Sequence, residues 1–228
     1  MPTIDCSHPL ESGMPVYPGD DPVAITETST VPTDGSALRR LECSSHVGTH
    51  VDAPAHKVAD GPTLDDFDVG DFVFEARLVD CTHAAPREPL EPDVLPAEFV
   101  DDQAATEVDA LVFHTGWSEY WGRDRYRDSP YLAPALARRC AEAGYHVGID
   151  AFSPDPVPSA TPHREAADEP TDQPAHAALC GAELLILENL RGLDRLPARF
   201  ELRATPLRIR GGDGSPVRAV AHVPQDRT

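Results

Sequence analysis

The chain has 228 residues, enough for one domain with a substantial core, and no stretch of it resembles a linker between two domains. Its formal net charge of −20 predicts a surface that repels nucleic acid and anionic membranes, so we expect neither of them as a partner. No apolar run is long enough to cross a membrane, and the start of the chain lacks the basic and apolar regions of a secretory signal, so we expect a cytoplasmic protein.

The N-terminal part is predicted to be extended and rich in turns. Residues 3–21 contain MPVYPGDDP, whose prolines and Pro-Gly-Asp turn favour a structured loop. Tyr17 lies in this loop, and it either lines a pocket or packs on the core beneath a surface turn. Residues 23–30 and 37–45 are predicted strands, and they lead directly into SSHVGTHVDAPAH at residues 44–56.

This stretch places three histidines and one aspartate within eleven residues: His46, His50, Asp52 and His56. The β-branched residues between them, together with Gly48 and Pro54, favour an extended segment over a helix. Because side chains alternate between the faces of a strand, the first two histidines and the aspartate would project to one side. Such a ligand set suits zinc, manganese or a similar divalent ion. The alternative is a polar, solvated strand edge, but packing these groups together without a cation would leave buried polar groups unpaired.

The middle of the chain is predicted to alternate strands and helices. Residues 72–81 and 109–114 have the apolar patterns of strands, with a possible short helix at 92–100 between them. The clearest helix is predicted at 129–143, with a capping serine, a proline in the first turn and a glycine after its end. A further strand is predicted at 145–150.

The C-terminal part begins with a proline-rich, acidic loop at residues 153–173. A short helix is predicted at 174–180 and a buried strand at 182–188. That strand ends in Glu188, and a buried glutamate needs a partner. Residues 200–223 are predicted to form a hairpin with RGGDGSP as its turn.

The sequence HVGTHVDAPAH resembles the signature of the cyclase family of metal-dependent hydrolases, which includes bacterial-type kynurenine formamidases and isatin hydrolases. Further blocks resemble the family in the expected order: DCSHPLESGMPVYPGD, VFHTGW, VGIDAFSPD, HAALCGAELLILENL and GSPVRAVA. The resemblance covers nearly the whole chain. It implies an α/β fold with one domain over residues 1–228, built as a mixed sheet or open barrel flanked by a few helices. It also implies a homo-oligomer, either a dimer or a tetramer.

In this family a later histidine and glutamate, twelve residues apart, complete a second metal site. His176 and Glu188 have that spacing, with His163 and His146 as competing candidates, of which His163 lacks the surrounding helix and strand. The resemblance thus implies two divalent ions, zinc in preference to manganese, with Asp52 bridging between them. The implied ligands are His46, His50, Asp52, His176 and Glu188. It also implies that Tyr17 contacts the substrate.

The same resemblance makes His56 the acid–base residue, the alternative being a third ligand or a support for the ligands. The implied reaction is attack by a metal-activated hydroxide on a carbonyl, with His56 protonating the departing amine. The preferred substrate is N-formyl-L-kynurenine, which gives L-kynurenine and formate. One alternative is another small cyclic amide, lactone or ester, as in an isatin hydrolase. Another is a non-enzymatic metal-binding protein, against which the presence of His56 argues.

Cysteine and lysine usage add two expectations. The five scattered cysteines include no CxxC pair, which predicts free and mostly buried thiols in a reducing compartment. Lys57 is the only lysine of the chain. A surface that is poor in lysine and carries a net charge of −20 predicts a protein adapted to a salt-rich cytoplasm, and the alternative is an ordinary acidic enzyme. Salt would then stabilise the fold by screening self-repulsion.

Overall fold

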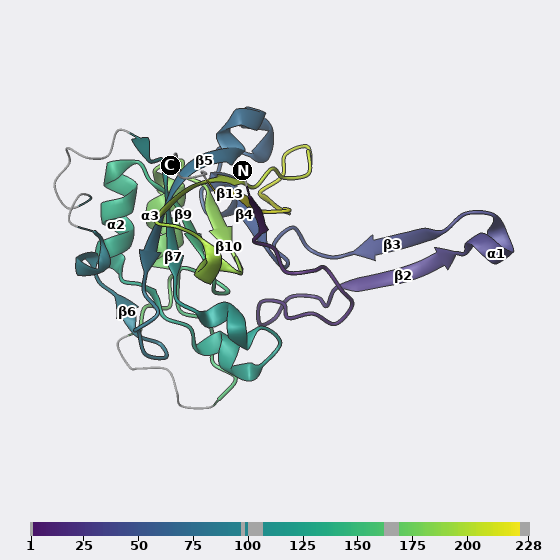
Figure 1. The fold of residues 1–228 in the computed structure, drawn as a ribbon, viewed down its shortest axis with the longest axis horizontal. Coiled ribbons are helices and arrows are strands. Elements are labelled where there is room, and N and C mark those ends of the chain that lie inside the picture. Colours follow the sequence, from purple (N-terminus) through teal and green to yellow (C-terminus); the bar gives the residue numbers. More distant parts are fainter. Residues whose placement is uncertain (1, 97–98, 100–106, 162–168, 224–228) are drawn as a thin grey trace.

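The computed structural model describes residues 2–96, 99, 107–161 and 169–223. Its centre is a nine-stranded mixed sheet, curled into a half-barrel (Figure 1). The strands are β1 (Thr3–Asp5), β4 (His50–Asp52), β5 (Val73–Asp80), β7 (Ala110–His114), β9 (His146–Ile149), β10 (Ile186–Glu188), β11 (Arg199–Arg203), β12 (Gly214–Pro216) and β13 (Val220–His222). Their order in the sheet is β1-β13-β11-β5-β7-β9-β10-β4-β12. The predicted α/β fold with a mixed sheet and a few helices is confirmed.

The middle of the sheet is parallel and its two flanks are antiparallel. Strands β5, β7, β9 and β10 run in the same direction. On one flank β4 pairs antiparallel with both β10 and β12. On the other, β11 pairs antiparallel with both β5 and β13. Parallel strands need long crossovers, and the connections from β7 to β9 and from β9 to β10 each contain a helix.

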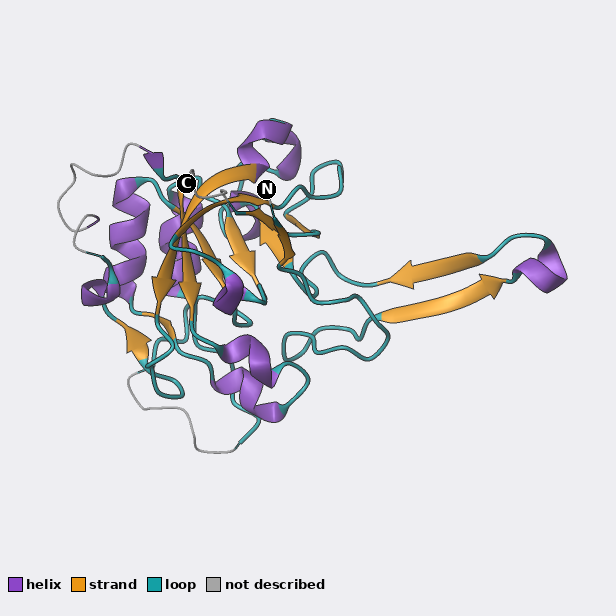
Figure 2. Cartoon of the chain, in the orientation of Figure 1, coloured by secondary structure: helices purple, strands orange, loops and turns teal. Residues whose placement is uncertain are grey.

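The central strands are buried on both faces, which explains their continuous apolar sequences. On β7, Leu111 and Phe113 pack in a cluster with helices α2 (Pro134–Ala143) and α3 (Pro174–Gly181). The alternate residues Ala110 and Val112 pack in a second cluster on the opposite face. The two helices lie against one side of the sheet, as Figure 2 shows. One strand therefore contributes side chains to both hydrophobic cores.

A two-stranded arm projects from the body (Figure 1). It consists of β2 (Ala24–Ser29), the short helix α1 (Val31–Asp34) and β3 (Leu38–Glu42). Three of its apolar side chains are largely exposed: Val31 at 62%, Leu38 at 60% and Leu41 at 59%. The strands predicted at 23–30 and 37–45 are confirmed in this arm, outside the main sheet.

Minor elements complete the described chain. Strands β6 (Pro89–Leu90) and β8 (Tyr131–Leu132) form a small parallel pair. The 3₁₀ helices are Pro54–His56, Leu64–Asp66, Val69–Phe72, Pro92–Val94, Trp117–Tyr120, Asp124–Asp128 and Leu193–Arg195. Within the described ranges, no helix is both long and apolar enough to span a membrane. All five cysteines are free, and only Cys43 is exposed.

Several predicted boundaries are wrong. The helix expected at 129–143 begins at Pro134, because Tyr131 and Leu132 pair with β6 before the helix starts. Of the strand expected at 182–188, only Ile186–Glu188 is a strand. Of the helix expected at 92–100, Pro92–Val94 forms a 3₁₀ turn and Phe99 is also in 3₁₀ conformation, while residues 97–98 and 100 lie outside the described chain.

The C-terminal hairpin is only partly as predicted. Strands β11 and β13 do pair antiparallel, with Leu202 opposite Ala221. The segment between them is more than a turn, because β12 crosses to the far edge of the sheet and pairs with β4. This excursion places Asp213 and Gly214 beside the histidine-rich stretch.

Candidate metal centre and its cavity

Two neighbouring strands and one helix position four of the five predicted ligands. His50 and Asp52 project from the same face of β4, as the alternation of strand side chains requires. Strand β10 pairs with β4 so that Glu188 lies opposite His50. His176 extends from α3, which packs near the turn that follows β4. Residues far apart in the sequence thus meet in one buried cluster.

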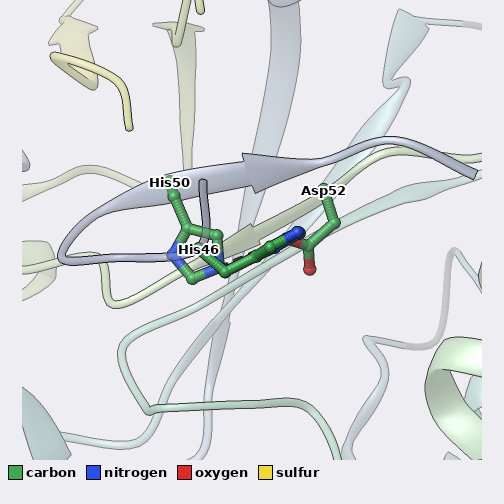
Figure 3. Close-up of side chains that lie close together, drawn as sticks. All are labelled: His46, His50 and Asp52. Atoms are coloured by element: carbon green, nitrogen blue, oxygen red, sulfur yellow. Dashed lines mark hydrogen bonds and ion pairs between the residues drawn. The ribbon is translucent and has the colours of Figure 1, made fainter. Parts of the chain in front are cut away.

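His46 reaches the cluster through a turn and not through the strand. The sequence analysis placed it on the same strand face as His50, but the chain bends over residues 45–49 and β4 begins at His50. The bend depends on Gly48, which has φ of 60°. A Cβ at Gly48 would also lie only 3.0 Å from Met14 Cε. Figure 3 shows the outcome: the His46 ring lies beside His50 and Asp52.

Each of the three imidazoles is held by one ring nitrogen and turns the other toward the carboxylates. His50 Nδ1 donates to the Gly48 carbonyl at 2.9 Å, and His176 Nδ1 donates to Asp155 Oδ2 at 2.7 Å. His46 Nε2 donates to Asp213 Oδ2 at 2.8 Å. The remaining nitrogens are His50 Nε2, His176 Nε2 and His46 Nδ1. Metal-binding histidines typically donate their other ring N–H in this way, which fixes the tautomer that binds the ion.

The spacing of the inward-facing atoms suits a metal ion. His50 Nε2 lies 3.2 Å from Asp52 Oδ1 and 3.3 Å from Glu188 Oε2. His176 Nε2 lies 3.5 Å from Asp52 Oδ2 and 3.3 Å from Glu188 Oε1. Ligands about 2.0–2.1 Å from a tetrahedral zinc ion are about 3.3 Å apart, so His50 and Asp52, and likewise His176 with Asp52 and Glu188, are separated as ligands of a shared ion would be.

Two buried carboxylate oxygens lack a hydrogen-bond donor. Asp52 Oδ2 and Glu188 Oε1 are buried and have no hydrogen-bond partner within the described part of the chain. Leaving such atoms unpaired is costly unless a cation is present. The residues therefore fit two divalent ions that share Asp52: one with His46 and His50, the other with His176 and Glu188.

The protonation of the metal-free cluster follows from its burial and its charge pairs. Burial by itself lowers the pKa of His50 and of His176, but neighbouring carboxylates raise both pKa values well above the usual range. Burial by itself raises the pKa of Asp52, but the adjacent imidazoles hold it well below the usual range. A divalent ion that binds here therefore competes with protons for these imidazole nitrogens.

His56 lies at the edge of this cluster. It ends the 3₁₀ turn Pro54–His56, and its ring centroid is 4.0 Å from that of His46 and 5.7 Å from that of His176. Its side chain is 25% exposed, and its Nδ1 lies 3.5 Å from Asp213 Oδ2. Burial lowers the pKa of His56, so the ring is neutral near pH 7 and can accept a proton.

Asp155 and Asp213 were missed by the sequence analysis. Asp155 lies in the loop predicted at 153–173, where its two oxygens accept the backbone N–H groups of Ala175 and His176 as well as His176 Nδ1. Asp213 lies in the segment predicted as a hairpin turn. No sequence motif points to either residue, because Asp155 lies 21 residues from His176 and Asp213 lies 167 residues from His46.

The competing candidate His146 lies away from the cluster. His146 Nδ1 accepts the backbone N–H of Leu185 at 2.9 Å, which makes it a structural residue between strands. His163 lies outside the described residues. Trp117 is buried and packs against Tyr120, and Trp121 stacks on His8 at a centroid distance of 4.0 Å.

The cluster opens into a cavity of about 960 Å³. Its walls include Tyr17, Phe152, Gln173 and the base of the arm at Ala24 and Glu42. The structure thus places Tyr17 on the cavity wall, and its hydroxyl accepts a hydrogen bond from Gln173 Nε2 at 3.5 Å. The site combines candidate metal ligands, a candidate acid–base and room for a small substrate.

Comparisons with known proteins point in the same direction. The family described as "Cyclase: Putative cyclase" matches residues 4–156. A kynurenine formamidase from Salinibacter ruber is 37% identical over 224 residues, which cover 96% of this chain and 97% of that protein. One from Geobacillus thermodenitrificans is 32% identical and covers 96% of each chain. An isatin hydrolase A from Labrenzia aggregata, solved with benzyl benzoate, has a TM-score of 0.82 and 26% identity over 98% of this chain and 94% of its own.

Proposed function

The chain belongs to the cyclase family, and on this premise we propose that it is a metal-dependent hydrolase that converts N-formyl-L-kynurenine to L-kynurenine and formate. Full-length relatives that bear the name kynurenine formamidase support the substrate. The observation that carries the chemistry is the set of three imidazoles, each held by one nitrogen and turned toward buried carboxylates, together with the Asp52 and Glu188 oxygens that have no hydrogen-bond partner in the described part of the chain.

We assign the ligands by the atoms that face inward. His46 Nδ1, His50 Nε2 and Asp52 would hold one divalent ion, while Asp52, His176 Nε2 and Glu188 would hold the second. Nitrogen and carboxylate donors without thiolate suit zinc, and manganese is the second choice. Such ions, when bound, would supply positive charge that lowers the pKa of a water molecule and polarises a carbonyl group.

The protein's own groups would handle the proton. Neutral His56 takes a proton from the attacking water and returns it to the leaving nitrogen, so that the C–N bond breaks to give formate and a free amine. Asp213 orients both His56 and His46, since one of its oxygens lies near a ring nitrogen of each. Tyr17 lines the cavity and would contact the aromatic ring of the substrate.

A substrate panel tests the proposal. Metal-loaded protein in high salt is supplied with N-formyl-L-kynurenine, with isatin and with simple esters, and the release of each product is followed. We expect the highest kcat/KM for the formamide. Turnover of isatin alone would favour the second candidate, hydrolysis of a cyclic amide, which the isatin hydrolase neighbours support. Absence of turnover in protein that retains its metal would refute the enzyme assignment.

We also propose a cytoplasmic homo-oligomer. The support for association is the arm, on which Val31, Leu38 and Leu41 are largely exposed although an isolated two-stranded sheet is only marginally stable in water. The support for a reducing compartment is the set of five free thiols. Light scattering on the purified chain would measure the subunit number, and a monomer would contradict the proposal.

A further inference from the structure

The cavity that leads to the metal cluster carries one side chain with a permanent positive charge. Lys57 is the only lysine of the chain, and among the described residues that line the cavity it is the only lysine or arginine. It directly follows His56, so the backbone of the 3₁₀ turn fixes it next to the proposed acid–base residue. Its side chain is exposed to solvent and can reach a bound molecule.

Neutral groups hold the ammonium in place. Lys57 Nζ donates to Gln173 Oε1, and Gln173 Nε2 donates to the Tyr17 hydroxyl at 3.5 Å. Gln173 has φ of 53° at the start of α3, a left-handed conformation that sets the direction of its side chain. In the described part of the chain no carboxylate is paired with Lys57. Because its partner is an uncharged amide, the charge of Lys57 remains available to an anion.

The same cavity also carries negative charge away from the metal cluster. Asp20, Asp21 and Glu42 are exposed and line its wall. On a protein with net charge −20, a simple anion is repelled at long range. A zwitterion is not, because its two charges can contact groups of opposite sign. One ammonium and three carboxylates line the same cavity, so it offers a group of opposite sign to each charge of an α-amino acid.

We propose that Lys57 binds the α-carboxylate of an amino-acid substrate and that the acidic residues Asp20, Asp21 and Glu42 receive its α-ammonium group. The cavity then selects aryl formamides that carry an amino-acid chain over uncharged aryl amides and cyclic amides. This inference rests on the proposed function and deepens it, because it names the part of the substrate that the pocket recognises. Metal ligands act on the reacting carbonyl and cannot make this distinction.

A pair of substrates isolates the carboxylate. N-formyl-L-kynurenine is compared with N-formylkynuramine, which lacks only that group, using full-length, metal-loaded protein. The variants are Lys57→Met, which removes the charge, and Lys57→Arg, which keeps it. Arg138→Met is the matched control, since Arg138 is an exposed cation on α2 that does not line the cavity. Equal metal content and equal melting temperature establish that each variant is folded.

We expect Lys57→Met to lower kcat/KM for N-formyl-L-kynurenine by ~10-fold, mostly through KM, as for loss of one solvent-accessible charged hydrogen bond. The preference for it over N-formylkynuramine should shrink by about the same factor. Lys57→Arg should restore most of the preference, and Arg138→Met should leave it at the wild-type value. Calorimetric titration with the products should agree: Lys57→Met should weaken binding of L-kynurenine but not that of kynuramine.

Two failures are distinguishable. If the wild type hydrolyses both formamides and Lys57→Met leaves the ratio of their kcat/KM values unchanged, the role of Lys57 is refuted while the formamidase proposal stands. If the wild type hydrolyses neither formamide, the proposed function fails. The product titrations then still decide whether Lys57 recognises a carboxylate. If Lys57→Met weakens the binding of L-kynurenine and of kynuramine equally, the proposed role of Lys57 is refuted.

Discussion

Adding one methyl group at Gly214 should displace His46 and remove the metal ion that we propose His46 helps to hold. A Cβ built at Gly214 lies 2.5 Å from His46 Cε1, whereas ordinary contact begins near 3.4 Å, so the ring must retreat by about 0.9 Å. The backbone cannot yield easily, because Gly214 lies in β12 and is paired with Asp52 of β4. The imidazole is the group that moves.

That displacement is large for a metal ligand. The ring is held by contacts of 2.6 Å to Asp52 and 2.8 Å to Asp213, and both would be lost or stretched. Metal–ligand distances tolerate deviations of about 0.2 Å, so His46 would cease to be a ligand. We expect Gly214→Ala to bind one ion per chain, retained by Asp52, His176 and Glu188. Misplacement by ~1 Å in an active site can cost ~10²-fold in rate, and we expect a loss of kcat of that order.

The assay is elemental analysis after dialysis against low free metal, together with turnover of N-formyl-L-kynurenine. Gly70→Ala is the control, because a Cβ at Gly70 meets no atom within 4 Å and the residue does not line the cavity. If Gly214→Ala retains two ions with wild-type affinity, then His46 is not a ligand held by this turn, and the reasoning is wrong.

Three further predictions concern the acid–base residue, pH and salt. His56→Ala should retain both ions and lose ~10²–10⁴-fold in kcat; loss of metal in step with activity would instead make His56 a ligand or its support. Burial lowers the pKa of His146 from 6.5 to about 4, so its stabilising contribution is complete above pH 6.5 and is lost as the pH falls toward 4. The variant His146→Asn keeps a hydrogen-bond acceptor for the Leu185 N–H but does not titrate. Between pH 7 and pH 4, the free energy of unfolding of the wild type should therefore fall more than that of the variant, and the difference should reach up to about 3 kcal/mol. Denaturant titrations that give parallel pH curves for the two proteins would contradict this. Because the net charge is −20, the melting temperature should rise across a chloride series, and equal values in dilute and molar salt would rule out stabilisation by screening.

Local features of the sequence sufficed for part of the site. The two-residue alternation of a strand places His50 and Asp52 on one face whatever the rest of the chain does. The apolar runs of β7 and β9 required burial on both faces, which predicts strands in the middle of a sheet. Pro54 ended the strand and turned the chain, as expected, and so placed His56 beyond it.

Tertiary structure alone decided which groups hold the imidazoles. Asp155 reaches His176, and Asp213 reaches His46, because loops distant in sequence pack beside β4 and α3. The bend at Gly48, and not strand alternation, brings His46 into the cluster. Such contacts depend on the strand order and on the crossing of β12 to the edge beside β4. Strand order is set by the burial of whole faces of the sheet, which no local spacing encodes.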